Sequence, residues 1–125
     1  MTFTPKDFTV WMEIPVSDLT KAIAFYETAT GGTLQRQQMG PNETAVFQVS
    51  DPATGVAGHL YEGTPAADGQ GPTIHLAAEG ALEAALDRVR AAGGKVLSDP
   101  IPLPVGRFAY CQDPDGNSIG LFETS

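Results

Sequence analysis

Glu13, His59 and His75 are the side chains of this sequence best suited to chemistry. Two imidazoles and one carboxylate can hold iron, nickel, zinc or manganese. The same groups could instead transfer a proton without a metal, because burial can bring the pKa values of histidine and glutamate side chains towards neutral pH. A further interpretation is that they bind polar groups of a ligand, or one another. The separation between Glu13 and His75 in the sequence recurs between other pairs along the chain.

Aromatic side chains alternate with these groups. Trp11 lies two residues before Glu13, Tyr61 lies two residues after His59, and a second aromatic pair follows later in the chain, at Phe108 and Tyr110. Side chains two apart in a strand share a face. The pattern therefore predicts either an aromatic pocket for a planar ligand or ordinary packing on a sheet.

Arg107 and Cys111 each have two interpretations. Arg107 follows the proline-rich segment 101–106, which could lie over a pocket and present a cation to an anionic ligand, or could be a solvated loop with a surface arginine. Cys111 has no basic neighbour in the sequence, which favours a buried inert thiol over a nucleophile.

Two helices of about three turns must help to position these residues. Apolar side chains recur at helical spacing and glycines follow each run, at Leu19, Ala22, Ile23, Tyr26, Ala29 and Gly31–Gly32, and again at Leu82, Ala85, Leu86, Val89, Ala92 and Gly93–Gly94. Ser17 or Asp18 can cap the first helix, whereas the start at 79–81 offers a poorer cap. Matched positions of the two helices are separated by the same offset as Glu13 and His75, to within one position.

Eight strands are predicted around the helices, four in each half. The first half has 8–16, 33–38, 44–49 and 56–61, and the second has 73–77, 95–98, 107–112 and 118–122. Asp51-Pro52 and Asp113-Pro114 mark turns separated by that same offset, so the same unit occurs twice. One domain over 1–125 is expected, with a first βαβββ module at about 7–63, a linker at 64–72 and a second module at about 73–124.

The predicted fold is α+β, with two tandem βαβββ modules that form a cup-shaped mixed sheet and helices on the outside. The concavity of the cup is the natural place for a ligand. Seven basic and fifteen acidic residues give a net charge of −8, which argues against nucleic acid and anionic membranes as partners. One cysteine and the absence of a long apolar segment favour a cytoplasmic location.

Two segments resemble a known family. The stretch 11–19, WMEIPVSDL, together with 22–26, AIAFY, is similar to the first strand and helix of vicinal oxygen chelate proteins, and 113–121, DPDGNSIGL, is similar to their last hairpin. This superfamily includes glyoxalase I, extradiol dioxygenases, fosfomycin-resistance enzymes and bleomycin-binding proteins. The resemblance implies paired βαβββ modules, commonly in a homodimer, but a shared fold does not transfer a reaction.

The metal-using relatives take one ligand from the opening strand and one from the closing strand of each module. The resemblance places these four positions on Trp11, His59, Thr73 and Gly120. Of these, His59 alone carries a usual ligand, and one imidazole does not fix a catalytic divalent ion. A shifted set of Glu13, His59 and His75 would be offset by one pleat from the familiar site.

Three functions remain open. The first, which we favour, is a metal-free small-molecule binding protein of the bleomycin-sequestering kind that has lost the usual site, with Trp11, Glu13, His59, Tyr61, His75, Phe108 and Tyr110 in contact with the ligand. The second is a lyase or isomerase of glyoxalase type that uses one divalent ion at the shifted set. The third is a non-catalytic interaction or regulatory module.

Overall fold

A computed structural model of the chain describes residues 2–124. The elements of the first half are β1 (Met12–Val16), α1 (Leu19–Thr30), β2 (Leu34–Met39), β3 (Asn42–Phe47) and β4 (Gly58–Glu62). Those of the second half are β5 (Ile74–Ala77), α2 (Leu82–Ala91), β6 (Lys95–Val96), β7 (Ile101–Leu103), β8 (Gly106–Gln112) and β9 (Ser118–Thr124). Within residues 2–124, neither helix has the length and apolar character that crossing a membrane requires.

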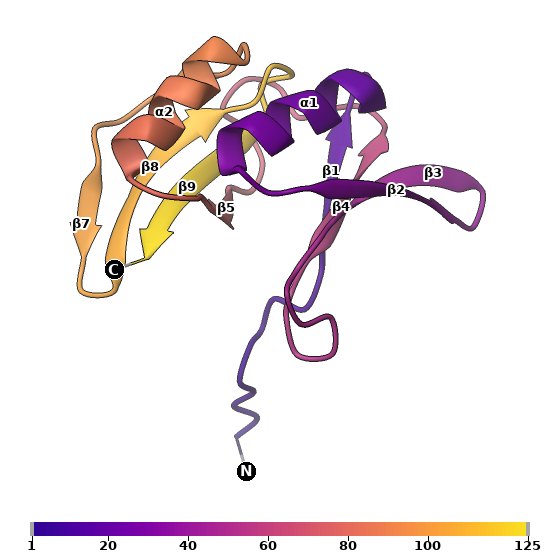
Figure 1. Cartoon of the computed structure of the whole chain (residues 1–125). Helices are drawn as coiled ribbons and strands as arrows, with labels where there is room; N and C mark the ends of the chain where they lie inside the picture. The colour runs from indigo at the N-terminus through magenta and orange to yellow at the C-terminus, as the bar shows by residue number, and fades with distance from the viewer. Residues whose placement is uncertain (1, 125) are drawn as a thin grey trace.

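Each half builds its own mixed sheet. The strand order is β1-β4-β3-β2 in the first sheet and β5-β9-β8-β6 in the second, where β7 also pairs with β8. The opening strand of each half runs parallel to its closing strand, and the remaining pairs are antiparallel. Figure 1 shows the two helices side by side above the sheets, which leaves the opposite sheet faces open. The predicted α+β fold with repeated halves is confirmed.

The helices lie where they do because of their apolar faces. Tyr26 and Ala29 of α1 are fully buried, as are Leu82 and Val89 of α2. They join one core with the inward side chains of both sheets, among them Val16, Leu60, Ile119 and Leu121. Burial of this continuous apolar surface is the main force that holds the halves together.

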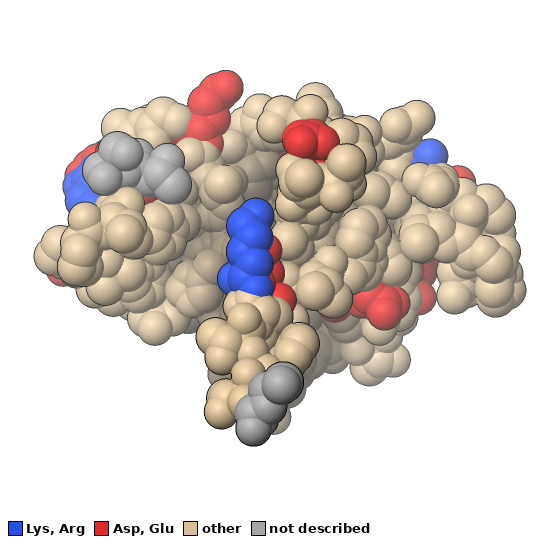
Figure 2. Space-filling view, turned by 90° about the horizontal axis from the view of Figure 1, so that it is seen from below, with Lys and Arg blue, Asp and Glu red and all other residues tan. Residues whose placement is uncertain are grey.

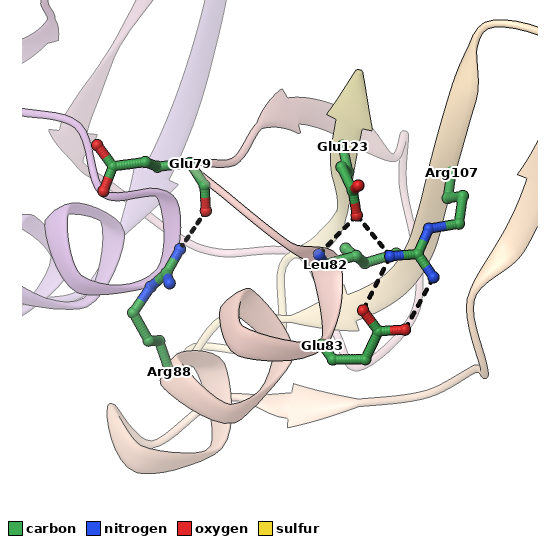
Figure 3. A network of polar contacts seen from close by, with 6 residues as sticks. All are labelled: Glu79, Leu82, Glu83, Arg88, Arg107 and Glu123. Carbon is green, nitrogen blue, oxygen red and sulfur yellow. Dashed lines mark hydrogen bonds and ion pairs between the residues drawn. The ribbon is translucent and has the colours of Figure 1, made fainter. Parts of the chain in front are cut away.

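Each helix is also capped by its own closing strand. Asp18 accepts a hydrogen bond from the N–H of Lys21, as expected for an N-cap. Glu62 at the end of β4 accepts from the N–H of Leu19 at 3.0 Å, and Glu123 of β9 accepts from the N–H of Leu82 at 2.7 Å. Figure 3 shows the second of these contacts. The prediction that α2 lacks a good local cap agrees with the structure, in which Glu123 from a distant strand caps the helix instead.

Three contacts tie the turn between β8 and β9 to the first half. Tyr26 Oη donates to Asp113 Oδ2 at 2.6 Å, and Ser17 Oγ donates to Asp115 Oδ1 at 2.5 Å. Asn117 Nδ2 donates to the carbonyl of Pro15 at 2.8 Å. The turn that the sequence marked as a repeat thus also joins the halves.

Two strand predictions were wrong in detail. The first strand begins at Met12 rather than at residue 8, because its neighbour β4 begins at Gly58, the partner of Met12, and earlier residues have no strand to pair with. The segment 101–106 is not a plain loop: Ile101–Leu103 forms β7 at a sheet edge, where its proline is tolerated. The remaining predicted strands differ by a few residues at their ends.

Candidate functional site

Trp11, His59 and Glu13 form a hydrogen-bonded chain on the open face of the first sheet. Glu13 pairs with His59 across β1 and β4, which places their side chains next to each other. His59 Nε2 lies 3.2 Å from Glu13 Oε1, and Trp11 Nε1 donates to His59 Nδ1 at 3.0 Å. The His59 side chain is buried, 9% exposed, whereas the Glu13 side chain is 62% exposed. The exposed end of this chain is therefore a carboxylate.

The indole fixes the state of the imidazole. An indole N–H can only donate, so Nδ1 of His59 must accept and the proton of the neutral ring lies on Nε2, where it can donate to Glu13. Both ring nitrogens are thus engaged. A metal ion or a substrate proton could reach His59 only after one of these contacts broke. Glu13 is the member of the trio that is ready to receive a ligand.

Tyr61 continues this face, and a second aromatic group lies on the other sheet. The rings of His59 and Tyr61 are 6.1 Å apart. On the second sheet, His75 lies 5.1 Å from Phe108 and 5.9 Å from Tyr110 between ring centroids, and Phe108 stacks on Phe122 at 6.3 Å. The predicted pairing of aromatic residues on shared faces agrees with this arrangement. Both open faces offer aromatic surface.

His75 fills the space beside Gly120. The two residues are register partners across β5 and β9, and a Cβ built on Gly120 would overlap the imidazole of His75. Gly120 occupies a position where the resemblance places a metal ligand. Any side chain there would require His75 to move, so His75 stands where that ligand would be.

The side chains at two other expected ligand positions form hydrogen bonds within the protein. Trp11 bonds to His59, and Thr73 Oγ1 lies 2.7 Å from Ser118 Oγ within the second sheet. Glu13 and His59 come together, but His75 lies on the other sheet, against Phe108 and Tyr110. Over residues 2–124, no group of three or more His, Cys, Asp or Glu side chains is arranged to hold a metal ion. The four positions do not form the hard donor set that a divalent ion prefers.

Arg107 forms ion pairs within the protein, and Cys111 is buried in the core. Arg107 donates to both oxygens of Glu83 at 2.8 Å and to Glu123 at 2.5 Å, so it joins β8, α2 and β9, as Figure 3 shows. These contacts lower the pKa of Glu83 to about 2. Cys111 is fully buried, and burial raises the pKa of its thiol to about 11. The inert interpretation of Cys111 agrees with the structure.

Sequence reasoning missed the partners of Trp11 and Arg107. Both pairings connect residues far apart in the chain, with 48 positions between Trp11 and His59 and 24 between Arg107 and Glu83. The only signal for the pairing of Trp11 with His59 was indirect. Trp11 shares a strand face with Glu13, and His59 shares a strand face with Tyr61. The sequence does not show the register in which β1 pairs with β4.

Comparison with known proteins identifies the fold independently. The family described as Glyoxalase/Bleomycin resistance protein/Dioxygenase superfamily matches residues 9–121. A Synechocystis protein named "Probable lactoylglutathione lyase" is 34% identical over 122 residues, which cover 90% of this chain and 92% of that protein. "Putative glyoxylase CFP32" of Mycobacterium tuberculosis is 29% identical over 118 residues, and the chain spans about two fifths (40%) of its length.

One protein of known structure with a similar fold is named for the class of ligand that it binds. It is TnmS3, an antibiotic binding protein from a Streptomyces species, with a TM-score of 0.62 and 26% identity over 98% of this chain and 100% of that one.

Proposed function

The chain belongs to the glyoxalase/bleomycin resistance protein/dioxygenase superfamily, and within it we propose that this protein binds a small planar molecule without a metal ion. The observation that carries the proposal is the hydrogen-bonded chain of Trp11, His59 and Glu13. It engages both nitrogens of the imidazole and leaves an exposed carboxylate beside an indole. Such a surface suits a ligand with an aromatic body and a cationic or N–H group.

Three further features support this proposal. His75 and Tyr110 supply a second aromatic surface, and the buried ring of Phe108 supports them from beneath. The net charge of −8 attracts cations. TnmS3, with a similar fold, is named for antibiotic binding. We propose that the usual metal site has been lost, because Trp11, Thr73 and Gly120 offer no ligand set for a divalent ion.

Binding can be tested with two planar probes of opposite charge. Proflavine is a planar aromatic cation, and anilinonaphthalene sulfonate is an aromatic anion. Trp11 is the only tryptophan of the chain, so its fluorescence reports directly on this face. We expect saturable quenching by proflavine and at least tenfold weaker binding of the sulfonate. Glu13→Gln should weaken proflavine binding about tenfold, whereas Glu43→Gln, which changes an exposed carboxylate on β3, should leave it unchanged. Equal binding of both probes, or equal effects of the two variants, would contradict the proposal.

A glyoxalase-type lyase is the second candidate, because the Synechocystis relative is named as a lactoylglutathione lyase and is 34% identical. That function would use a divalent ion, for which the sequence suggests Glu13, His59 and His75. Metal analysis of protein purified without chelator or affinity tag separates the two candidates. Less than about a tenth of an equivalent per chain, with no formation of lactoylglutathione when nickel or zinc is added, supports metal-free binding. One equivalent of bound metal together with turnover supports the lyase.

A further inference from the structure

A small pocket of about 140 Å³, called the side pocket below, adjoins Glu13, the exposed carboxylate of the candidate site. It lies between β1 and β5, which are edge strands of the two sheets, and the connecting segment 63–73. Its apolar wall consists of Ile14, Pro15, Ala66, Pro72, Ile74 and Ile119. Among residues 2–124, the wall of a larger cleft of about 700 Å³ includes His75 but not Glu13. A group on a nitrogen that Glu13 binds would therefore meet the side pocket.

Two polar side chains of the side pocket form hydrogen bonds within the protein. Asn117 Nδ2 donates to the carbonyl of Pro15 at 2.8 Å. The hydroxyl of Ser118 lies 2.7 Å from that of Thr73. Among the described residues of the wall, Glu13 is the one that carries a charge. The side pocket thus places one carboxylate next to apolar surface.

The connecting segment is held against the rest of the fold. The N–H of Gln70 bonds to the carbonyl of Ala67 at 2.9 Å, which closes a turn in which Gly69 has a φ of 70°. The segment also packs on the turn between β8 and β9, because a Cβ built on Gly116 would overlap the carboxylate of Asp68. The side pocket is therefore already formed before a ligand binds.

The side pocket borders the open faces of both sheets. Glu13 and Pro15 are two residues apart on β1, and Ser118 lies two residues before Gly120, the register partner of His75, on β9. Side chains two apart share a face of a sheet, so this wall is continuous with the aromatic surfaces of the candidate site. Figure 2, which views the molecule from below, shows mainly uncharged atoms on this side, with basic atoms near the centre and scattered carboxylates.

We propose that the side pocket receives a short alkyl group attached to the nitrogen that Glu13 binds. This inference rests on the proposed function and narrows its ligand to a planar aromatic cation that carries an N-alkyl group. An apolar cavity of about 150 Å³ can hold a benzene molecule. A pocket of about 140 Å³ that borders solvent at Glu13 therefore takes an alkyl chain of about four carbons.

The length of the alkyl group should control affinity. A methylene group that is fully removed from water strengthens binding about fourfold. Because the side pocket borders solvent, we expect a gain of about threefold for each methylene that enters it. A chain longer than the pocket should gain little more, since its end would return to water.

A series of 9-aminoacridines with one alkyl group on the exocyclic nitrogen tests the inference. Each compound is a planar aromatic cation and keeps one N–H for Glu13. Quenching of Trp11, the only tryptophan of the chain, measures binding. From N-methyl to N-propyl, we expect the dissociation constant to fall about tenfold. From N-butyl to N-hexyl, it should change less than about twofold, because the pocket is full.

Two variants of the connecting segment show where the alkyl group binds. Ala66→Leu places a larger side chain in the wall of the side pocket and should reduce the preference for N-propyl over N-methyl to less than about twofold. Ala67→Leu is the matched control, because Ala67 is the next residue, is exposed and does not line the pocket. It should keep the wild-type preference. This preference is a ratio of two dissociation constants, so a general effect of a variant on acridine binding cancels.

Failure of this inference and failure of the proposed function give different results. The inference is overturned if the N-methyl compound binds but N-propyl does not bind more tightly, if the gain continues to N-hexyl, or if Ala66→Leu keeps the wild-type preference. In each of these cases the proposed function stands. If no compound of the series quenches Trp11, the proposed function is wrong and the inference fails with it. Circular dichroism and thermal unfolding establish that both variants are folded, and the comparison of chain lengths in wild-type protein needs no variant.

Discussion

Tyr26 of α1 donates its phenolic hydrogen to Asp113 of the β8–β9 turn over 2.6 Å, in the buried interior between the halves. Burial, and then the adjacent Asp113 carboxylate, raise the pKa of Tyr26 well above its ordinary value. Asp113 also accepts from the N–H groups of Asp115 and Asn117 and from the Asn117 side chain. One carboxylate thus holds the turn and joins it to the first helix.

Removal of this hydroxyl should destabilise the whole domain. Tyr26→Phe removes one hydrogen bond to a carboxylate, and the remaining donors keep Asp113 satisfied, so we expect a loss of about 1 to 2 kcal/mol in the free energy of unfolding. Urea denaturation followed by circular dichroism measures it. Tyr61→Phe is the control, because the Tyr61 hydroxyl has no hydrogen-bond partner within residues 2–124 and its loss should change little. Equal effects of the two variants would show that the contact contributes nothing specific.

The ion pairs of Arg107 should make stability depend on pH in the acid range. Arg107 lowers the pKa of Glu83 to about 2 and lowers that of Glu123 as well. A carboxylate with a lowered pKa in the folded state stabilises the fold above its unfolded pKa. That stabilisation is lost as the pH falls through the folded value. Wild-type protein should therefore lose thermal stability between about pH 5 and pH 2.

Arg107→Gln should flatten this part of the profile. Without the guanidinium, both glutamates titrate nearer their ordinary range, and the melting temperature should change less between pH 5 and pH 2. Arg36→Gln is the matched control, since Arg36 pairs with Glu43 on the exposed β2–β3 hairpin. It should keep the wild-type slope. If Arg107→Gln keeps that slope too, the network does not control acid stability.

The sequence predicts more of the fold than of the candidate site. Helical spacing and turn residues act locally, so the repeat that relates the two halves was enough to give two helices and two sheets. The contacts that define the site are not local. Whether Glu13 meets His59 depends on the register of β1 against β4, and a shift of one residue would place the two side chains on opposite faces of the sheet. His75 could not be placed beside Gly120 for the same reason.

The helix caps show the same limit. The sequence places Asp18 at the start of α1, where its side chain accepts a hydrogen bond from the N–H of Lys21, only three residues away. It gives no sign that Glu62 and Glu123 reach the N-termini of the two helices from strands much later in the chain. Long side chains at strand ends find such partners only after the sheet has packed against the helix.

Gly120 should tolerate no side chain while His75 is present. Its backbone does not have a positive φ, so any penalty comes from space alone. Gly120→Ala places a methyl group against the imidazole, and we expect a loss of about 1 to 3 kcal/mol in the free energy of unfolding. In a His75→Ala background, the same change should have an effect below about 0.5 kcal/mol, a coupling that a double-mutant cycle measures. Gly32→Ala, where the nearest atom outside the adjacent residues is at 3.4 Å, should be close to neutral. Additive effects of the His75 and Gly120 changes would show that the ring does not occupy that space.

Cys111 should react with thiol reagents only when the protein unfolds. Its side chain is fully buried on β8, the strand that lies between β6 and β9, and a pKa of about 11 leaves it about a hundredfold less thiolate at pH 8 than an ordinary pKa of 9 would. Ellman's reagent should release less than about a tenth of an equivalent of chromophore from native protein within minutes. It should release one equivalent at once in 6 M guanidinium. A Leu97→Cys variant supplies the comparison, because position 97 is exposed and should react rapidly in the folded protein. Rapid reaction of native Cys111 would mean that the second sheet opens far more often than its packing against α2 predicts.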